Sequence, residues 1–433
     1  RRRQRQMCIR DRRYLEVLPV EPGWRIVSLG EGGTFLHRGQ KLAEELGVKW
    51  LYVKDETTNP TGSFLDRGAS VLTTRLLRIS VSHVACASTG NLGASMAAYA
   101  AKAGLRCTVY TVRRVDLGKL YQMAAYGADV RTSTSLDEAE EEAKRAGGFY
   151  ASSIDPFFLE GLKTTTWELC EQLGWNPPDV LVLPVGTGGH LYMAWRALKE
   201  MEELGFIEEA STRIVAVQTK GCAPLVRAFE QGLDHVEPLE EVDVDLLDIG
   251  FPDPPLGDEA LRAVKESSGV AVAVSYEESM DALRQLARLE GVFCEPAAGS
   301  TVAGLRKLVE QGWVDRGERV VCVITGEGLK DPRTASKLPE ANLKAAGILM
   351  GAKLRGRLGK TKVEVLRALA DGRHHGYGIW MRLRDLGVEV TLPSLYQHLR
   401  ELVDMGLIRE AGVEARGGRR RRLYALTERG AMV

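Results

Sequence analysis

The sequence predicts an α/β protein with two domains, in which a large parallel-sheet domain is followed by a small basic domain. From residue 24 to about 345, short β-branched runs alternate with longer amphipathic stretches, as is typical of a parallel sheet covered by helices. Between 346 and 359, glycines lie among basic residues and indicate a linker. From residue 360 onward, a compact unit follows with its own apolar spacing.

The expected strands of the large domain are short and rich in β-branched residues: Trp50 to Lys54, His83 to Ala87, Arg106 to Thr111, Val180 to Val185, Ile214 to Gln218 and Val320 to Thr325. Helical patterns lie between them, for example Asn91 to Ala103, Asp137 to Ala146 and Leu191 to Leu204. In a sheet of this kind, functional groups lie at the carboxyl ends of strands, where loops meet helix N-termini. The loops after these strands are therefore the candidate site.

Composition excludes several classes of protein. No apolar run approaches the roughly 20 residues of a membrane span, so no membrane partner is expected. The seven cysteines are scattered and form no Cys-x-x-Cys pair, which predicts reduced thiols in a cytoplasmic protein and no metal site. The first thirteen residues include seven arginines, and residues 1–13 are expected to be a disordered basic tail or an artefact.

The net charge of zero hides an asymmetry between the two domains. Residues 355–433 hold 16 Lys or Arg against 9 Asp or Glu, whereas the remainder holds 42 against 49. Opposite signs in two parts of one chain predict two kinds of partner.

The most informative segment is Lys54–Gly68, which reads Lys-Asp-Glu-Thr-Thr-Asn-Pro-Thr-Gly-Ser-Phe-Leu-Asp-Arg-Gly. It resembles the cofactor-lysine motif of threonine synthases, which are enzymes of the pyridoxal phosphate (PLP) fold type II. In that family, the residue after Ser-Phe is the lysine that forms a Schiff base with PLP. Leu65 stands there in this chain, and without an amine it can form no imine and transfer no proton. The resemblance therefore implies a catalytic position that is inactive as written.

Further loops carry the same resemblance in the family's order along the chain. Ser88, Thr89, Gly90 and Asn91 open a helix, whose free backbone amides suit a carboxylate. The resemblance implies that Ser88, Thr89 and Gly90 hold the substrate carboxylate and that Asn91 meets the pyridine 3-hydroxyl. A simple helix cap is the alternative.

Gly186, Thr187, Gly188, Gly189 and His190 follow the strand at Val180, and such glycines let backbone amides wrap a phosphate. The family usually has asparagine at the positions of Thr187 and His190.

Two loops farther along the chain complete the set. Thr325, which opens Thr325–Pro332, matches the loop near the pyridine nitrogen, and Glu295–Ser300 matches a segment beside the cofactor. For Glu295–Ser300, an ordinary tight turn before the helix from Thr301 is the alternative. The resemblance implies a two-lobed fold-type II domain over residues 14–345, with PLP held noncovalently if it binds.

A second departure lies in Ser153–Thr164. The arginine that clamps the substrate phosphate in the family falls on Phe158, and a phenyl ring lacks the paired donors that phosphate recognition uses. Phe157 and Leu162 move the same wall toward apolar character. Ser153 and Lys54 remain candidates for substrate binding, and Lys54 or Lys163 could replace the missing amine only if reach and geometry allow it.

The small domain, residues 360–433, has three predicted helices, at Val363–Ala370, from His374 and at Thr391–Leu402. A strand, a glycine turn and four arginines follow. This pattern resembles the PadR-like winged-helix regulators. From the way helix-turn-helix proteins bind DNA, we expect the third helix in the major groove and the arginine hairpin against phosphates. The candidate DNA contacts are Ser394, Tyr396, Gln397, His398, Arg400, Arg419, Arg420, Arg421 and Arg422.

Purely structural interpretations remain open for two of these features. Tyr396 fits a core position at its helical spacing, and the arginines fit a solvated loop. PadR-like proteins usually carry a further dimerisation helix after the wing, and the chain stops at Val433. A homodimer formed through the large domain is therefore expected.

Together these observations favour a DNA-binding regulator that responds to an amino acid or a phosphorylated amino acid. One alternative is a PLP-dependent threonine synthase that converts O-phosphohomoserine, with a regulatory winged helix and an engineered or erroneous residue 65. The other is an enzyme-domain scaffold whose winged helix contacts proteins.

Overall fold

The computed structural model describes residues 13–244, 246–335, 358–370, 372–416, 419–427 and 430. Its contacts divide the chain into two compact units, Arg1–Ala335 and Ser336–Val433. The predicted tail up to Arg12 and the predicted linker up to Arg357 lie outside the described residues. The linker bounds therefore stay a prediction.

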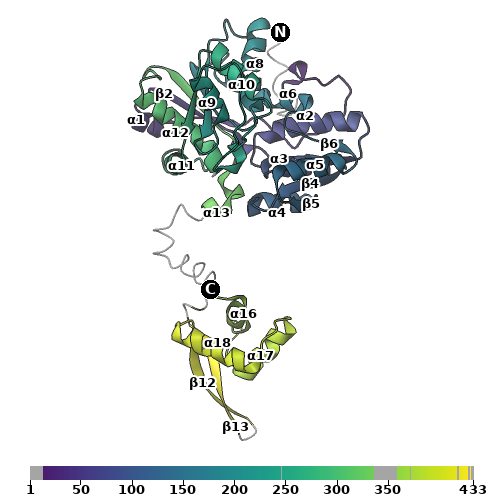
Figure 1. Ribbon diagram of the computed structural model, residues 1–433, viewed down its shortest axis with the longest axis vertical. Coiled ribbons are helices and arrows are strands. Elements are labelled where there is room, and N and C mark those ends of the chain that lie inside the picture. The colour runs from purple at the N-terminus through teal and green to yellow at the C-terminus, as the bar shows by residue number, and fades with distance from the viewer. Residues whose placement is uncertain are drawn as a thin grey trace. The chain divides into compact units, whose positions relative to one another are not determined.

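The larger unit contains two sheets (Figure 1). The first has six strands, of which the edge strand β1 is antiparallel to β2 and the other neighbours pair in parallel. In spatial order they are β1 (Phe35–Arg38), β2 (Trp50–Asp55), β10 (Arg319–Ile324), β7 (Val180–Pro184), β8 (Arg213–Thr219) and β9 (Val270–Val274).

The second sheet has four strands, all parallel. In spatial order they are β5 (Asp129–Ser133), β4 (Arg106–Val112), β3 (His83–Ser88) and β6 (Phe149–Tyr150). One wholly parallel and one mostly parallel sheet confirm the α/β architecture with two lobes that the sequence predicts.

Helices connect these strands. The α-helices are α1 (Gln40–Leu46), α2 (Leu65–Arg78), α3 (Asn91–Ala103), α4 (Leu117–Ala125), α5 (Leu136–Arg145), α6 (Pro156–Leu162), α7 (Thr164–Gln172), α8 (Gly189–Glu203), α9 (Pro224–Glu230), α10 (Gly257–Glu266), α11 (Tyr276–Glu290), α12 (Pro296–Glu310) and α13 (Pro332–Ala335). Short 3-10 turns are η3 (Leu15–Val17), η4 (Glu56–Thr58), η5 (Leu247–Ile249) and η6 (Gly328–Lys330).

The alternation of side chains along β3 sets which helix covers which face of the smaller sheet. Val84 and Cys86 belong to the core shared with α3, whereas Ala85 packs with Ala139 and Ala143 of α5. Because successive strand residues point to opposite faces, α3 and α5 lie on opposite sides of this sheet.

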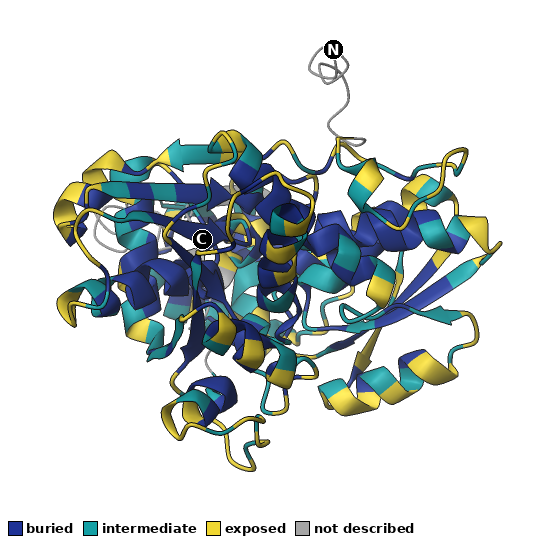
Figure 2. Cartoon of the chain, turned by 90° about the horizontal axis from the view of Figure 1, so that it is seen from above, coloured by how far each residue is buried: buried dark blue, intermediate teal, exposed yellow. Residues whose placement is uncertain are grey.

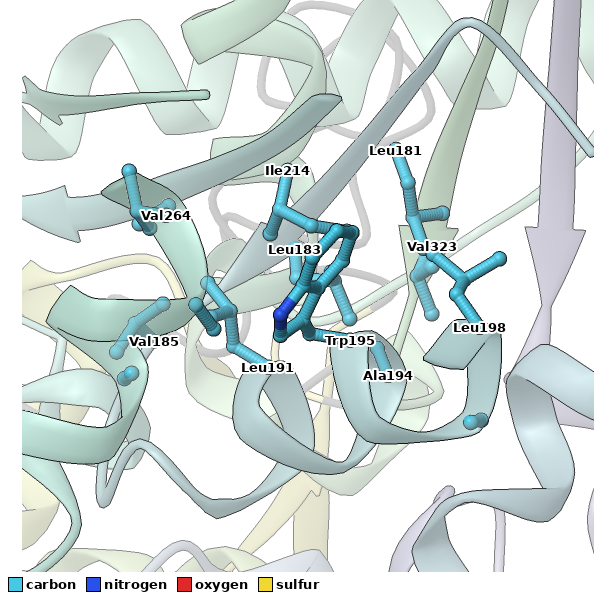
Figure 3. Close-up of a cluster of buried hydrophobic side chains, with 14 of the residues drawn as sticks. Leu181, Leu183, Val185, Leu191, Ala194, Trp195, Leu198, Ile214, Val264 and Val323 are labelled. Carbon is cyan, nitrogen blue, oxygen red and sulfur yellow. The ribbon is translucent and has the colours of Figure 1, made fainter. Parts of the chain in front are cut away.

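The core of the larger sheet lies beneath α8. Trp195 packs with Leu183 and Ile214 of neighbouring strands and with Val323 of β10 (Figure 3). The buried residues of the larger unit concentrate in the strands and on the inward faces of the helices (Figure 2). These cores hold the carboxyl ends of the strands, and so the loops that follow them, in place.

In its described residues, the smaller unit shows three helices and a three-stranded antiparallel sheet, in the order β11-β13-β12. Its elements are α16 (Lys360–Ala368), β11 (His374–His375), α17 (Gly376–Asp385), α18 (Leu392–Asp404), β12 (Ile408–Arg416) and β13 (Arg419–Leu426). Leu395, Leu399 and Leu402 of α18 are fully buried, which is the spacing that a helix needs to pack on a small core. Within the described segments, no helix is both long and apolar enough to cross a bilayer.

Candidate functional site

A cavity opens at the carboxyl ends of the parallel strands in the larger unit. Most of the residues predicted for the site line this one cavity: Leu65, Ser88, Thr89, Asn91, Ser153, Gly186, Thr187, Gly188, His190 and Thr325. Gly90 and Gly189 are their neighbours in the chain. The fold therefore brings together loops that are separated by up to 260 residues, from Leu65 to Thr325.

The position of Leu65 is set by its loop and by the helix that it starts. Leu65 is the first residue of α2, and Phe64 N donates to Thr325 O over 3.0 Å. Glu327 N donates to Gly62 O over 2.9 Å, so a second hydrogen bond joins the same two loops. Residue 65 is thus pinned beside the loop of Thr325, at the wall of the cavity.

The loop after β3 is held by its first hydroxyl. Ser88 Oγ accepts hydrogen bonds from the backbone N–H groups of Gly90 and Gly93, both over 2.9 Å. Gly90 has φ of 146°, and a Cβ there would lie 2.2 Å from Cδ of Lys119. Only glycine fits such a position, so this loop brings the start of α3 against Lys119.

Asn91 and Glu295 meet across the cavity wall. Asn91 Nδ2 donates to Glu295 Oε2 over 2.7 Å. Asn91 Oδ1 is buried and has no hydrogen-bond partner among the described residues. Burial raises the pKa of Glu295, and the nearby Lys119 opposes this rise.

Lys119 is enclosed by carboxylates. Its amine lies 2.7 Å from Asp248 Oδ2, 2.8 Å from Glu295 Oε1 and 3.5 Å from Asp116 Oδ2. Burial opposes the charge, yet the surrounding carboxylates hold the pKa of Lys119 above its ordinary value. Lys119 is therefore a charged ammonium that is already paired.

His190 is a buried polar side chain at the cavity. It is the second residue of α8 and is 6% exposed. Its ring stacks on Phe64 with centroids 4.3 Å apart, and neither ring nitrogen has a hydrogen-bond partner among the described residues. Burial lowers the pKa of His190 to about 4, so the ring is neutral near pH 7.

The glycine-rich loop packs against the chain segment that follows η5. Gly188, the N-cap of α8, has φ of 89°, and a Cβ there would lie 2.2 Å from Leu256 O. A Cβ at Gly186 would lie 3.0 Å from Asp248 O. Packing within the protein therefore requires glycine at position 188, whereas a side chain at position 186 would press against Asp248 O.

Lys54 lies apart from the cavity lining. Its side chain is fully buried, and its amine contacts Glu168 Oε1 at 2.5 Å, Gln172 Oε1 at 2.9 Å and Thr34 O at 3.1 Å. Arg67 pairs with Glu56 and with the same Glu168, at 2.6 and 3.1 Å. We call Lys54, Glu56, Arg67 and Glu168 the ionic network, in which Lys54 is one member of a paired scaffold.

The side chains of the apolar segment around Phe158 lie partly at the cavity and partly in the core. Leu162 lines the cavity, whereas Phe158 is fully buried against α2, where a Cβ at Gly68 would lie 2.5 Å from its ring. Lys163 pairs with Glu160 at 2.5 Å and Glu200 at 2.9 Å.

Sequence reasoning missed several residues at the cavity. Asp248 and Glu140 line it, and Lys119 contacts two of its carboxylates. Asp248 lies in a stretch without helical or strand periodicity, so no local pattern marks it. Lys119 comes shortly after the carboxyl end of the predicted strand Arg106–Thr111. That position was the sequence signal that could have marked Lys119 as a residue of the site.

In the smaller unit, the predicted DNA contacts lie on the exposed part of α18 and on the hairpin. Tyr396, Gln397 and Arg400 are exposed, and Ser394 and His398 are partly buried. The ring of Tyr396 covers Gly376, where a Cβ would lie 2.7 Å from it. Tyr396 is therefore partly a packing residue.

A groove runs between α18 and the hairpin. Tyr396, Arg400, Arg421 and Arg422 line it. Arg421 and Arg422 are exposed, and Arg422 pairs with Glu410 at 2.7 Å. The side chains of Arg419 and Arg420 lie outside the described set, although both residues belong to β13.

Comparison with known proteins agrees with this geometry. The family model described as pyridoxal-phosphate dependent enzyme matches residues 27–326. The chain belongs to this family. The model of the PadR-like transcriptional regulator family matches residues 365–433, so a PadR-like domain follows the enzyme-like one.

Curated relatives include threonine synthases. That of Methanocaldococcus jannaschii is 44% identical over 338 residues, covering 77% of this chain and 83% of the relative. That of Methanosarcina acetivorans is 40% identical over 328 residues, covering 74% and 80%. The resemblance to threonine synthases is therefore confirmed.

Solved structures share the fold at lower identity. Threonine deaminase isoform 2 from Solanum lycopersicum matches with a TM-score of 0.63 and 22% identity, covering 76% of this chain and 86% of that one. Maize serine racemase matches with a TM-score of 0.59 and 21% identity, covering 68% and 88%. These matches confirm the predicted fold class.

Proposed function

We propose that this chain is a DNA-binding regulator whose larger unit binds a small ligand and no longer performs threonine synthase chemistry. The observation that carries the proposal is Leu65 at the cavity wall, where the family resemblance calls for the Schiff-base lysine. An isobutyl group supplies neither the nucleophile nor the proton carrier of that chemistry.

The lysines near this region offer no evident substitute. No lysine is among the described residues that line the cavity. The amines of Lys54, Lys119 and Lys163 are held by carboxylates, and Lys330 Nζ donates to Thr61 O over 2.6 Å. A tethered ammonium must lose its partner before it can react.

The cofactor that the family implies fits the cavity only in part. The N-terminus of α8 and its glycine loop suit a phosphate, and the unpartnered Asn91 Oδ1 and the hydroxyl of Thr325 suit the groups of a pyridine ring. The aldehyde finds no amine among the described lining residues. We therefore propose that PLP, if it is a ligand, binds noncovalently.

Reductive trapping tests the enzymatic half of the proposal. The chain is incubated with PLP, reduced with borohydride and mapped for pyridoxyl-lysine, with Leu65→Lys as the matched variant. We expect no adduct at a cavity lysine in the chain as written and an adduct at position 65 in the variant. A stoichiometric adduct on any native lysine of the larger unit would contradict the proposal.

The second candidate is a threonine synthase with an erroneous residue 65, which the 44% identity to a threonine synthase favours. It predicts that Leu65→Lys releases phosphate from O-phosphohomoserine at a rate well above that of the chain as written. The buried Phe158, in place of the family's arginine, favours the regulator instead, because it leaves the substrate phosphate without paired donors.

The smaller unit supplies the proposed DNA contacts. Exposed Arg400, Arg421 and Arg422 border one groove, and guanidinium groups suit phosphates. We propose that a homodimer presents two such units to paired half-sites. A gel-shift assay with and without ligand, together with size-exclusion chromatography, tests both statements. DNA affinity that ignores every ligand bound by the cavity would refute the regulatory coupling.

A further inference from the structure

The cavity of the larger unit carries a negative excess. Glu140, Asp248 and Glu295 line it, whereas no lysine or arginine is among the described lining residues. Lys119, which contacts two of these carboxylates, is already shared by Asp248, Glu295 and Asp116. Away from the N-terminus of α8, a phosphate dianion beside these carboxylates would meet like charge, and the ammonium of Lys119 is already paired.

The lining of the cavity includes several apolar side chains. They are Leu65, Leu136, Ile154, Leu162 and Phe251. Covering these side chains with another apolar group is favourable, by about 25 cal/mol for each Å² of apolar surface that is removed from water. These side chains include residue 65 itself, so the leucine that removes the amine also adds to the apolar lining.

Polar groups without partners lie at the same cavity. His190 is 6% exposed and neutral, and neither of its ring nitrogens has a partner among the described residues. Buried Asn91 Oδ1 also has none there. A buried polar atom without a partner costs about 1–3 kcal/mol, so these atoms favour a ligand that carries its own donors and acceptors.

The start of α3 presents backbone N–H donors to an anion. Gly90 is the N-cap of this 13-residue helix, Ser88 Oγ accepts from the N–H of Gly93 in its first turn, and Ser88, Thr89 and Asn91 line the cavity beside it. A helix N-terminus attracts a single negative charge, such as a carboxylate.

We propose that the cavity binds a free α-amino acid with an apolar side chain, such as leucine. The carboxylate lies at the start of α3, the ammonium faces Asp248 and Glu295, and the apolar side chain covers Leu65 and Leu162. His190 supplies a neutral donor and acceptor to the polar end. The proposal rests on the proposed function, because it treats the cavity as a ligand site and not as a lyase centre.

The ligand class is tested by calorimetry on the full chain with a set of related compounds. L-leucine is compared with 4-methylpentanoate, which lacks the ammonium, with 3-methylbutylamine, which lacks the carboxylate, and with O-phospho-L-serine. We expect each of the three to bind at least about tenfold more weakly than L-leucine, because each leaves a polar group unpaired or adds repulsion.

Matched variants locate the binding. Leu65→Gln places an amide in the apolar lining and should weaken L-leucine binding about tenfold. Leu204→Gln changes an exposed leucine at the end of α8 and should leave the affinity unchanged. Circular dichroism of both variants checks that they are folded.

The outcomes separate this inference from the proposed function. Tighter binding of O-phospho-L-serine than of L-leucine overturns the apolar amino acid and leaves a ligand-responsive regulator in place. Equal binding of L-leucine by the chain and by Leu65→Gln also overturns it. PLP-dependent turnover of O-phosphohomoserine by the chain as written would instead remove the proposed function.

Discussion

Two regions flank the first turn of α2, and they differ in whether their buried polar groups have partners within the protein. In the ionic network, the guanidinium of Arg67 contacts Glu56 at 2.6 Å and Glu168 at 3.1 Å, and Lys54 contacts Glu168 at 2.5 Å. Leu65, two residues before Arg67 in the chain, lines the cavity, where Asn91 Oδ1 and both ring nitrogens of His190 have no hydrogen-bond partner among the described residues.

The difference teaches how one motif serves two purposes. Polar groups that are satisfied within the protein hold a fold together, whereas buried ones that are left open favour a ligand. The segment Lys54–Gly68 contains three residues of the ionic network, Lys54, Glu56 and Arg67, and it also places Leu65 at the cavity. Under the proposed function, the chain has the architecture of an enzyme without its reaction.

The largest expected effect comes from breaking the ionic network. Arg67→Met leaves Glu56 and Glu168 buried with less positive charge beside them, and we expect the free energy of unfolding of the larger unit to fall by about 3–5 kcal/mol. Denaturant unfolding followed by tryptophan fluorescence measures it.

The matched control for this prediction is Arg145→Met. Arg145 pairs with Glu141 on the exposed face of α5, where the side chains are 76% and 65% exposed, and such pairs contribute little. Equal losses in the two variants would show that the network is not a scaffold.

A pH series distinguishes the two regions further. Burial lowers the pKa of His190 to about 4, against an ordinary 6.5. Above pH 6.5 the ring is therefore neutral in both the folded and the unfolded chain, and its burial carries no cost of losing a proton. Stability is then lost as the pH falls from 6.5 through 4, by at most about 3 kcal/mol. His190→Asn should lack this loss.

The network loses its contribution in a lower range. Burial opposes ionisation of Glu168, but Arg67 and Lys54 hold its pKa well below the ordinary 4.5, so its contribution is present above pH 4.5 and lost only as the pH falls further. Comparing the chain with His190→Asn isolates the histidine, because buried carboxyls such as Glu295 are common to both. Parallel curves between pH 6.5 and 4.5 would contradict the assignment.

The smallest expected effect concerns the exposed arginines of the smaller unit. Arg421→Ala should lower the slope of log affinity against log salt by about 1, as for one phosphate contact. Arg422→Ala should lower it less, because Arg422 must first leave Glu410. Arg367→Ala removes the same charge from α16 and should not change the slope. A gel-shift salt series measures all three.

Much of the fold was predictable because strand and helix signals are local. The predicted strand at Trp50 to Lys54 is β2, and the one at His83 to Ala87 is β3, each extended by one residue. The helix expected from Asn91 to Ala103 matches α3 in both bounds. Apolar periodicity and glycine breaks lie within a few residues of the elements that they determine.

The candidate site was predictable only as a set of loops. Its members follow strands whose carboxyl ends meet at one edge, so their gathering follows from the parallel topology. The direction of single side chains did not follow. Phe158 turns to α2 instead of the cavity, and Tyr396 covers Gly376, because both orientations depend on contacts with distant elements.

By itself, the sequence determined the order of strands and helices, the loops at their ends and the absence of an amine at residue 65. The tertiary structure alone decided which groups meet across the cavity. Asn91 and Glu295 are 204 residues apart, and Lys119 and Asp248 are 129 apart, so no local pattern encodes their contact. Packing of the two lobes sets those distances, and with them the charge and the open hydrogen bonds that a ligand meets.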